Sequence, residues 1–219
     1  MEQARDGAPE ELWVRADRQT KGRGRHGRAW VSEPGNFFAS TLVRLRSTDL
    51  PVSQLAFTAA FALSNALEGW IESDRLSLKW PNDVLLDGAK LSGILLERDG
   101  DAVVIGFGVN LESHPQDIEG GAISVRAAGI TPPSPEMLLD TLALVWRRCI
   151  EHWREHGFET IRNAWIARAH KPGTPLAVRL ADGQMLNGTY DGLEADGALI
   201  LRLPDGETRA IHAGDIFTI

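Results

Sequence analysis

Apolar and polar positions are arranged along this chain in patterns that predict both strands and helices. Leu12–Val14 and Phe37–Leu45 are short apolar runs of the kind that form strands. Ser53–Trp70 is rich in alanine and leucine and contains no proline, which predicts a buried helix. Leu91–Glu97 and Ala102–Leu111 predict two further strands, joined as a hairpin because Asp-Gly, a favoured hairpin turn, separates them.

A second helical pattern follows residue 133. Ser134 suits the N-cap of a helix and Pro135 its first position. Apolar residues then recur every three or four positions, and the pattern resumes at Phe158 and ends near Lys171. Cys149 lies on this apolar face, so we expect it in the core rather than at a reactive site. The members of the face are Leu138, Leu142, Val145, Cys149 and Trp153.

The chain changes character after residue 172. Thr174–Ile219 contains four Asp-Gly pairs that separate short alternating runs such as Leu176–Leu180. Each pair predicts a turn, so the segment predicts a small five-stranded β-barrel. We therefore expect two domains: a larger domain of helices and strands at residues 1–171 and the barrel at residues 172–219.

Composition narrows the class of protein. The 219 residues include 23 Lys and Arg against 30 Asp and Glu, a formal charge of −7, which disfavours general binding to nucleic acid or anionic membranes. A single cysteine excludes a disulfide framework and a cysteine-based zinc site. No apolar run reaches membrane-spanning length, and the first residues lack the pattern of a signal peptide. We therefore expect a soluble, cytoplasmic protein.

Positive charge is concentrated in one glycine-rich segment, Arg15–Arg28. It holds six basic residues and one acid, and because the whole chain carries −7, the other 205 residues sum to −12. Glycine lets backbone N–H groups approach an anion, and arginine adds forked donors that fit phosphate and carboxylate oxygens. The segment therefore indicates binding of a nucleotide, pyrophosphate or acyl phosphate. A solvated flexible loop, or nonspecific contact with RNA, explains the same residues.

Two further segments contain residues suited to an active site. Lys79–Val84 (Lys-Trp-Pro-Asn-Asp-Val) joins a predicted strand to a turn. Lys90 opens a strand whose fourth residue is Gly93, where the missing side chain leaves room for a ligand. Ile105–Leu111 is a strand interrupted by two glycines, so a ligand or another backbone is expected close to it, beside the amide of Asn110. Taken singly, each segment is also compatible with an ordinary loop or strand.

In this order the segments resemble the catalytic domain of biotin protein ligases, also called biotin–[acetyl-CoA-carboxylase] ligases. The matching segments are Gly22–Arg28 with Trp30, Lys79–Val84, Lys90–Glu97 and Ile105–Leu111. The small C-terminal barrel also fits this family, so the resemblance covers nearly the whole chain. It implies an α+β fold, with a mixed sheet and packed helices similar to class II synthetases, followed by an SH3-like barrel.

The resemblance implies an ATP-dependent reaction in two steps. The carboxylate of biotin attacks the α-phosphate of ATP, which gives biotinyl-5′-AMP and pyrophosphate. A lysine of a biotin carboxyl-carrier domain, from acetyl-CoA carboxylase or a related carboxylase, then attacks the mixed anhydride. Magnesium is expected on the phosphates, with no metal ligand assigned to the protein. A relative that transfers lipoate or octanoate is the alternative on the same scaffold.

The resemblance also assigns functions to individual residues. Catalysis is expected to depend on Lys90, Arg25 and Asp83, with Lys90 bridging the biotin carboxylate and the α-phosphate. The basic segment is expected to be mobile without ligand and ordered by the adenylate. The residues expected to bind biotin are Gln19, Arg23, Gly24, Arg25, Lys90 and Gly93. Those expected to bind ATP are Arg25, Trp30 and Asn110.

One feature of the family is missing from this sequence. The family carries a Ser-Thr or Ser-Thr-Asn segment that hydrogen-bonds the ureido ring of biotin, whereas residues 1–19 contain no Ser, Thr or Asn. Each missing bond would cost about 1–3 kcal/mol. The sequence therefore predicts either a start codon upstream, which we favour, or a weakened or inactive homologue that acts as a binding module. We expect neither DNA nor a membrane as a partner, and homodimer formation is left open.

Overall fold

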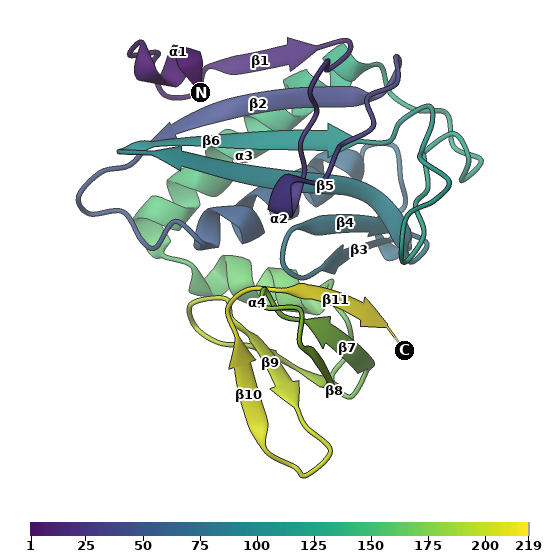
Figure 1. Cartoon of the computed structure of the whole chain (residues 1–219). Helices are drawn as coiled ribbons and strands as arrows, with labels where there is room; N and C mark the ends of the chain where they lie inside the picture. The colour runs from purple at the N-terminus through teal and green to yellow at the C-terminus, as the bar shows by residue number, and fades with distance from the viewer. Residues whose placement is uncertain (219) are drawn as a thin grey trace.

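A six-stranded sheet forms the centre of the larger part of the chain (Figure 1). The computed structural model describes residues 1–218. The strand order is β1-β2-β6-β5-β4-β3, and each neighbouring pair is antiparallel. The strands are β1 (Trp13–Ala16), β2 (Phe37–Arg44), β3 (Leu76–Lys79), β4 (Asp83–Leu86), β5 (Ala89–Asp99) and β6 (Ala102–Val109).

Helices α2 and α3 pack against each other and against one face of this sheet (Figure 1). α2 is buried on most sides, as its alanine and leucine content predicts. α3 begins where the sequence predicts, because the Ser134 side chain accepts a hydrogen bond from the Met137 backbone N–H at 3.2 Å. The helices are α1 (Glu2–Arg5), α2 (Gln54–Leu67), α3 (Pro135–His156) and α4 (Glu159–Ala167), with short 3₁₀ turns at Arg25–Gly27 and Ser73–Arg75.

A second, five-stranded antiparallel sheet follows α4 (Figure 1). Its order is β10-β9-β8-β7-β11, so β10 and β11 are its edges. Gly183, Gly197 and Gly206 close turns with positive φ, as predicted, but Gly192 lies inside β8, where the register with β9 shifts. That fourth Asp-Gly pair therefore accommodates a strand irregularity instead of a chain reversal. The strands are β7 (Pro175–Arg179), β8 (Met185–Leu193), β9 (Leu199–Arg202), β10 (Thr208–Ile211) and β11 (Asp215–Thr218).

The predicted α+β fold, the five C-terminal strands and the buried Cys149 are confirmed. Burial raises the pKa of the Cys149 thiol to about 11. The resemblance implied a sheet that mixes parallel and antiparallel pairing. In the larger sheet the strands pair antiparallel, and an isolated bridge between Lys90 and Ala122 is the only parallel pairing within residues 1–218. Short connections join β3, β4, β5 and β6 in succession, and such connections place consecutive strands antiparallel.

The two sheets meet beside the Lys79–Val84 segment. Trp80 is buried there, and its Nε1–H donates a hydrogen bond to the backbone oxygen of Gly197 at 3.1 Å. A Cβ atom at Gly197 would lie 2.6 Å from the ring of Phe57 on α2, so glycine is required for this close approach. Arg162 of α4 donates to the backbone oxygen of Leu193 in β8. Within residues 1–218, no helix has the combined length and apolarity needed to cross a membrane.

Candidate active site

A cavity of about 530 Å³ lies between the basic segment, strands β5 and β6, and the edge of the C-terminal sheet. Every residue to which the sequence or the resemblance gave a binding or catalytic function lines this cavity. The structure therefore brings together side chains from position 19 to position 110 of the chain. These residues are Gln19, Arg23, Gly24, Arg25, Trp30, Asp83, Lys90, Gly93 and Asn110.

Trp30 lies on a patch of sheet that two glycines leave open. Gly93 of β5 and Gly108 of β6 are opposite each other in the ladder. A Cβ atom at Gly108 would lie 2.5 Å from Cε2 of the indole, and one at Gly93 would lie 3.0 Å from Cζ3. Glycine is therefore required at Gly108 for the indole to approach the strand this closely. The sequence predicted a ligand or a backbone beside these strand glycines, whereas the structure places a side chain there.

Lys90 and Asp83 form an ion pair beside this patch. Nζ of Lys90 lies 2.7 Å from Oδ1 of Asp83, and the two side chains are 30% and 14% exposed. Asp83 opens β4 directly opposite Gly93. The ammonium also lies 5.8 Å from the centroid of the Trp30 ring. A lysine held in this way can present its charge to an anion bound against the indole.

Lys79 adds a second ammonium group, for which the sequence predicted no individual function. Burial lowers the pKa of Lys79, and the carboxylate of Asp83 partly opposes this effect. Its Nζ lies 5.6 Å from the ring centroid of Phe217 on β11. An anion bound in the cavity would favour the charged form of Lys79, because opposite charges stabilise each other in a partly desolvated site.

The basic segment folds back on itself where it borders the cavity. The backbone N–H of Trp30 donates to the oxygen of Gly22 at 3.0 Å, and that of Gly24 donates to the oxygen of Arg28 at 2.7 Å. A Cβ atom at Gly22 would lie 2.5 Å from the Trp30 oxygen, so glycine permits this closure. The alternation of glycines predicted backbone N–H groups that face an anion. The Gly24 N–H is instead used within the loop, where it bonds to the Arg28 oxygen. The side chains of Arg23, Arg25 and Arg28 in this segment line the cavity.

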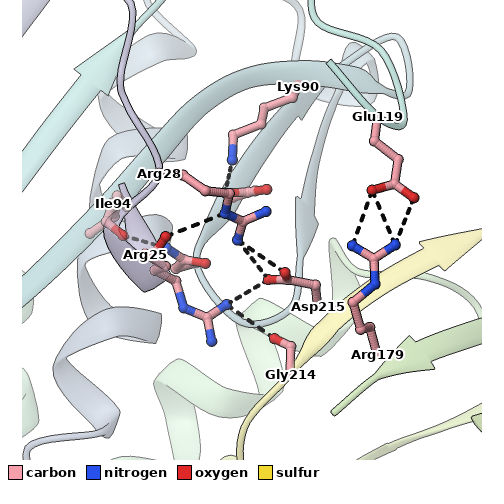
Figure 2. A network of polar contacts seen from close by, with 10 residues as sticks. Arg25, Arg28, Lys90, Ile94, Glu119, Arg179, Gly214 and Asp215 are labelled. Atoms are coloured by element: carbon pink, nitrogen blue, oxygen red, sulfur yellow. Dashed lines mark hydrogen bonds and ion pairs between the residues drawn. The ribbon is translucent and has the colours of Figure 1, made fainter. Parts of the chain in front are cut away.

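Carboxylates hold these arginines from two sides. Arg28 Nη2 lies 3.0 Å from Oδ2 of Asp215 on β11, and Arg25 Nη1 lies 3.3 Å from Oδ1 of the same residue (Figure 2). Burial lowers the pKa of Arg25, and Asp215 is the main opposing charge. Arg23 Nη2 lies 3.0 Å from Oε1 of Glu97 on β5. The most positive segment of the chain is therefore attached to both sheets.

Two of the predicted binding residues use their side-chain amides within the protein. Asn110 Nδ2 donates to the backbone oxygens of Ile123 at 3.2 Å and Lys90 at 3.4 Å. Asn110 thereby joins the start of β5 to the loop that follows β6. Its bond to the Lys90 backbone oxygen helps to position Lys90. Gln19 Oε1 accepts a hydrogen bond from the hydroxyl of Ser32 at 3.0 Å.

Sequence reasoning missed the contribution of the C-terminal sheet to this site. Arg179, Asp215 and Phe217 line the cavity, and Glu119 lines it from the loop after β6. Arg179 Nη2 lies 2.9 Å from Oε1 of Glu119, and its guanidinium carbon lies 4.7 Å from the ring centroid of Phe217. The ion pairs of Arg179 with Glu119 and of Asp215 with Arg25 join residues 60 and 190 positions apart, and no local spacing marks them.

The cavity wall carries more positive than negative charge, with seven Lys and Arg residues against five Asp and Glu. Such an excess attracts phosphate and carboxylate groups. In the described part of the chain, no group of three or more His, Cys, Asp or Glu side chains is arranged to hold a metal ion. The arrangement suits an anionic ligand with an aromatic part that can lie against Trp30.

Known families match both parts of the chain. The Biotin/lipoate A/B protein ligase family matches residues 4–110, and the Biotin protein ligase C terminal domain matches residues 177–218. The first range contains every residue with a predicted function, and the second contains Arg179, Asp215 and Phe217. The chain belongs to the biotin protein ligase family.

Named relatives agree with this family. The chain is 41% identical over 222 residues to the Biotin--[acetyl-CoA-carboxylase] ligase of Paracoccus denitrificans, covering 94% of this chain and 89% of that protein. It is 32% identical to the Bifunctional ligase/repressor BirA of Bacillus subtilis (strain 168), covering 98% of this chain and 68% of that protein. The structure of biotin protein ligase from Aquifex aeolicus in complex with biotin and ATP matches with a TM-score of 0.86 at 26% identity, covering 97% of this chain and 91% of that one.

Proposed function

We propose that this protein joins biotin to a lysine of a biotin carboxyl-carrier domain, using ATP and passing through biotinyl-5′-AMP. The observation that carries the proposal is the single cavity in which the Lys90–Asp83 ion pair, the Trp30 surface and the arginines of the basic segment meet. A relative at 41% identity is named for this ligation, and a solved relative holds biotin and ATP.

The first step must bring two anions together. A carboxylate oxygen of biotin bonds to the α-phosphorus of ATP, and the bond from that phosphorus to the bridging oxygen of pyrophosphate breaks. Lys90 faces both anions and reduces their repulsion, while Asp83 holds its ammonium in place at 2.7 Å. Arg25 and Arg23 add charge from the side of the basic segment.

The second step transfers the acyl group. The neutral amine of the carrier lysine attacks the carbonyl carbon of the mixed anhydride, AMP leaves with its phosphate oxygen, and the amine loses a proton. In this proposal Trp30 covers the adenine, Asn110 positions Lys90 beside the phosphates, and the remaining residues contact biotin or its adenylate. The biotin contacts are Gln19, Arg23, Gly24, Arg25, Lys90 and Gly93.

Magnesium belongs to the proposal as the ion that ATP carries on its phosphates. Asp83 is the acidic residue nearest to Lys90, and it is already paired with that ammonium. We therefore assign the metal to the substrate and to no set of protein ligands.

The proposal extends to the partner and to the arrangement of the chain. The carrier would belong to acetyl-CoA carboxylase or a related carboxylase, as the name of the Paracoccus denitrificans relative suggests, and the reaction would take place in the cytoplasm. Residues 1–171 would form the catalytic domain and residues 172–219 the C-terminal domain, since α4 ends at Ala167 and β7 begins at Pro175. The Paracoccus denitrificans relative and the Aquifex aeolicus structure are named for biotin, which favours it over lipoate or octanoate.

A direct assay tests the proposal. The protein is incubated with biotin, ATP, magnesium and a purified carrier domain, and mass spectrometry follows the attachment of biotin. We expect one biotin per carrier, and none on a carrier whose acceptor lysine is replaced by arginine. Lipoate in place of biotin should give no product. A carrier that stays unmodified in the presence of excess enzyme would refute the function.

A further inference from the structure

Asp215 connects the basic segment to the C-terminal sheet (Figure 2). Arg28 Nη2 lies 3.1 Å from one carboxylate oxygen of Asp215 and 3.0 Å from the other. Arg25 Nη1 donates to Oδ1 of Asp215 at 3.3 Å and to the backbone oxygen of Gly214 at 3.1 Å. The Asp215 side chain is only 20% exposed. Hydrogen bonds between charged groups in partly buried positions are stronger than neutral ones.

In the described part of the chain, Asp215 forms no ion pair within its own sheet. In the ladder between β7 and β11, Asp215 is opposite Arg179. The guanidinium of Arg179 nevertheless pairs with Glu119, at 2.9 Å. Within residues 1–218, the ion-pair partners of Asp215 are the two arginines of the basic segment. Without this carboxylate, Asp83, whose charge acts less strongly on Arg25, would be left to oppose the repulsion between Arg25 and Arg28.

The same sheet also holds the loop on the other side of the cavity. Arg179 and Glu119 share three N–O contacts between 2.9 and 3.2 Å (Figure 2). Arg179 also lies against the ring of Phe217. Both loops that border the cavity are therefore attached to adjacent strands, β7 and β11.

We infer that the C-terminal sheet is a clamp for the cavity, in which Asp215 is the positioning residue that keeps the basic segment closed over a bound acyl adenylate. The identity of this ligand rests on the proposed function, whereas the clamp itself is a property of the chain without ligand. An acyl adenylate reacts with water, so a loop fixed over it preserves the intermediate until the acceptor amine arrives. Asp215 acts through Arg25 and Arg28 and touches no reacting atom.

The first experiment measures the clamp without any ligand. Asp215→Asn keeps the size of the side chain and removes its charge. Amide hydrogen exchange is followed at Gly24 and Trp30, whose N–H groups close the loop. We expect exchange about tenfold faster in the variant, which corresponds to about 1.4 kcal/mol. Asp191→Asn is the matched control, because it removes a 2.6 Å ion pair with Arg202 inside the same sheet. The control should leave both amides unchanged.

A second variant separates the ion pair from a general weakening of the sheet. Arg28→Gln removes the other half of the contact without altering the C-terminal sheet. If the two residues act through each other, Asp215→Asn combined with Arg28→Gln should accelerate exchange no more than the larger single effect. Unchanged exchange in both single variants, fully additive effects, or equal acceleration in Asp191→Asn would overturn the clamp.

The second experiment measures retention of the intermediate. The full chain is loaded with labelled biotin, ATP and magnesium, free ligand is removed, and release of label is followed. We expect Asp215→Asn to release it about tenfold faster, while biotin-dependent ATP–pyrophosphate exchange falls by less than about threefold. Wild-type retention, or a larger loss in pyrophosphate exchange than in retention, would overturn the inference. A wild-type protein that forms no adenylate would refute the proposed function, and the ligand-free exchange would still decide whether the clamp exists.

Discussion

The two sheets of this protein use glycine and charge in different ways. In the six-stranded sheet, Gly93 and Gly108 lie within paired strands and leave room for Trp30, so strand backbone and indole form one wall of the cavity. In the five-stranded sheet, most Asp-Gly pairs close turns, and Arg179 and Asp215 at strand ends bind the neighbouring loops. One sheet therefore forms the surface of the site, and the other holds its loops.

The strengths of these contacts also differ. Exposed ion pairs contribute about 0–1 kcal/mol to folding, and the side chains of Arg179 and Glu119 are 40% and 61% exposed. Asp215 is more buried and contacts two arginines. We therefore expect the contacts of Asp215 to fix the basic segment more firmly than the Arg179–Glu119 pair fixes its loop.

The largest effect is expected in the six-stranded sheet. Lys90→Ala removes the ammonium that pairs with Asp83, and it should slow adenylate formation by about 10²- to 10³-fold, the usual cost of losing one preorganised donor. Arg25→Ala should slow the same step and also weaken the contact with Asp215. Biotin-dependent ATP–pyrophosphate exchange measures both variants.

Lys171→Ala is the matched control for Lys90→Ala, because Lys171 is exposed and outside the cavity. It should keep the wild-type exchange rate. All three variants should unfold at nearly the same temperature as the wild type. A Lys90→Ala protein with normal exchange would contradict the assigned function of Lys90.

An intermediate effect should come from the glycine patch. In Gly108→Ala the new Cβ would lie 2.5 Å from Cε2 of Trp30, so the indole must move. If Trp30 covers the adenine, the KM for ATP should rise about tenfold, because base–aromatic stacking contributes about 1–3 kcal/mol. Gly106→Ala is the control on the same strand, since its Cβ would lie 3.6 Å from the nearest atom, Ser40 Oγ. Equal KM values in the two variants would argue against this function of Trp30.

The smallest effect concerns the junction of the two sheets. His170 lies 6.3 Å from Tyr190 of β8, measured between ring centroids. Burial lowers the pKa of His170 from its ordinary value of 6.5, and Lys79 lowers it further. As pH falls below 6.5, the unfolded chain binds a proton that the folded chain does not, so stability decreases towards the lower folded-state pKa.

Thermal unfolding at a series of pH values measures this dependence. His170→Gln should make Tm less sensitive to pH over the range from about 7 to 5. His156→Gln, at an exposed position on α3, is the control and should keep the wild-type slope. If His170→Gln also keeps that slope, the buried imidazole is not its source.

Most of the secondary structure could be predicted because it depends on neighbours a few positions apart. The Ser134 cap marks the start of α3, and Asp-Gly at 99–100 forms the β5–β6 hairpin. The error at Gly192 has the same origin, because a local turn signal does not reveal that the residue lies in a strand irregularity. The predicted mobility of the basic segment without ligand stays a prediction.

The amino-acid sequence alone determined which side chains this protein has for anion chemistry, and it concentrated positive charge in Arg15–Arg28. Only the tertiary structure decided what those side chains contact. Asn110 bonds to backbone oxygens, the Gly24 N–H closes its own loop, and Asp215 reaches Arg25 across 190 positions. The physical reason is that ion pairs and close contacts depend on distance in space, which packing of the two sheets sets and which spacing along the chain does not encode.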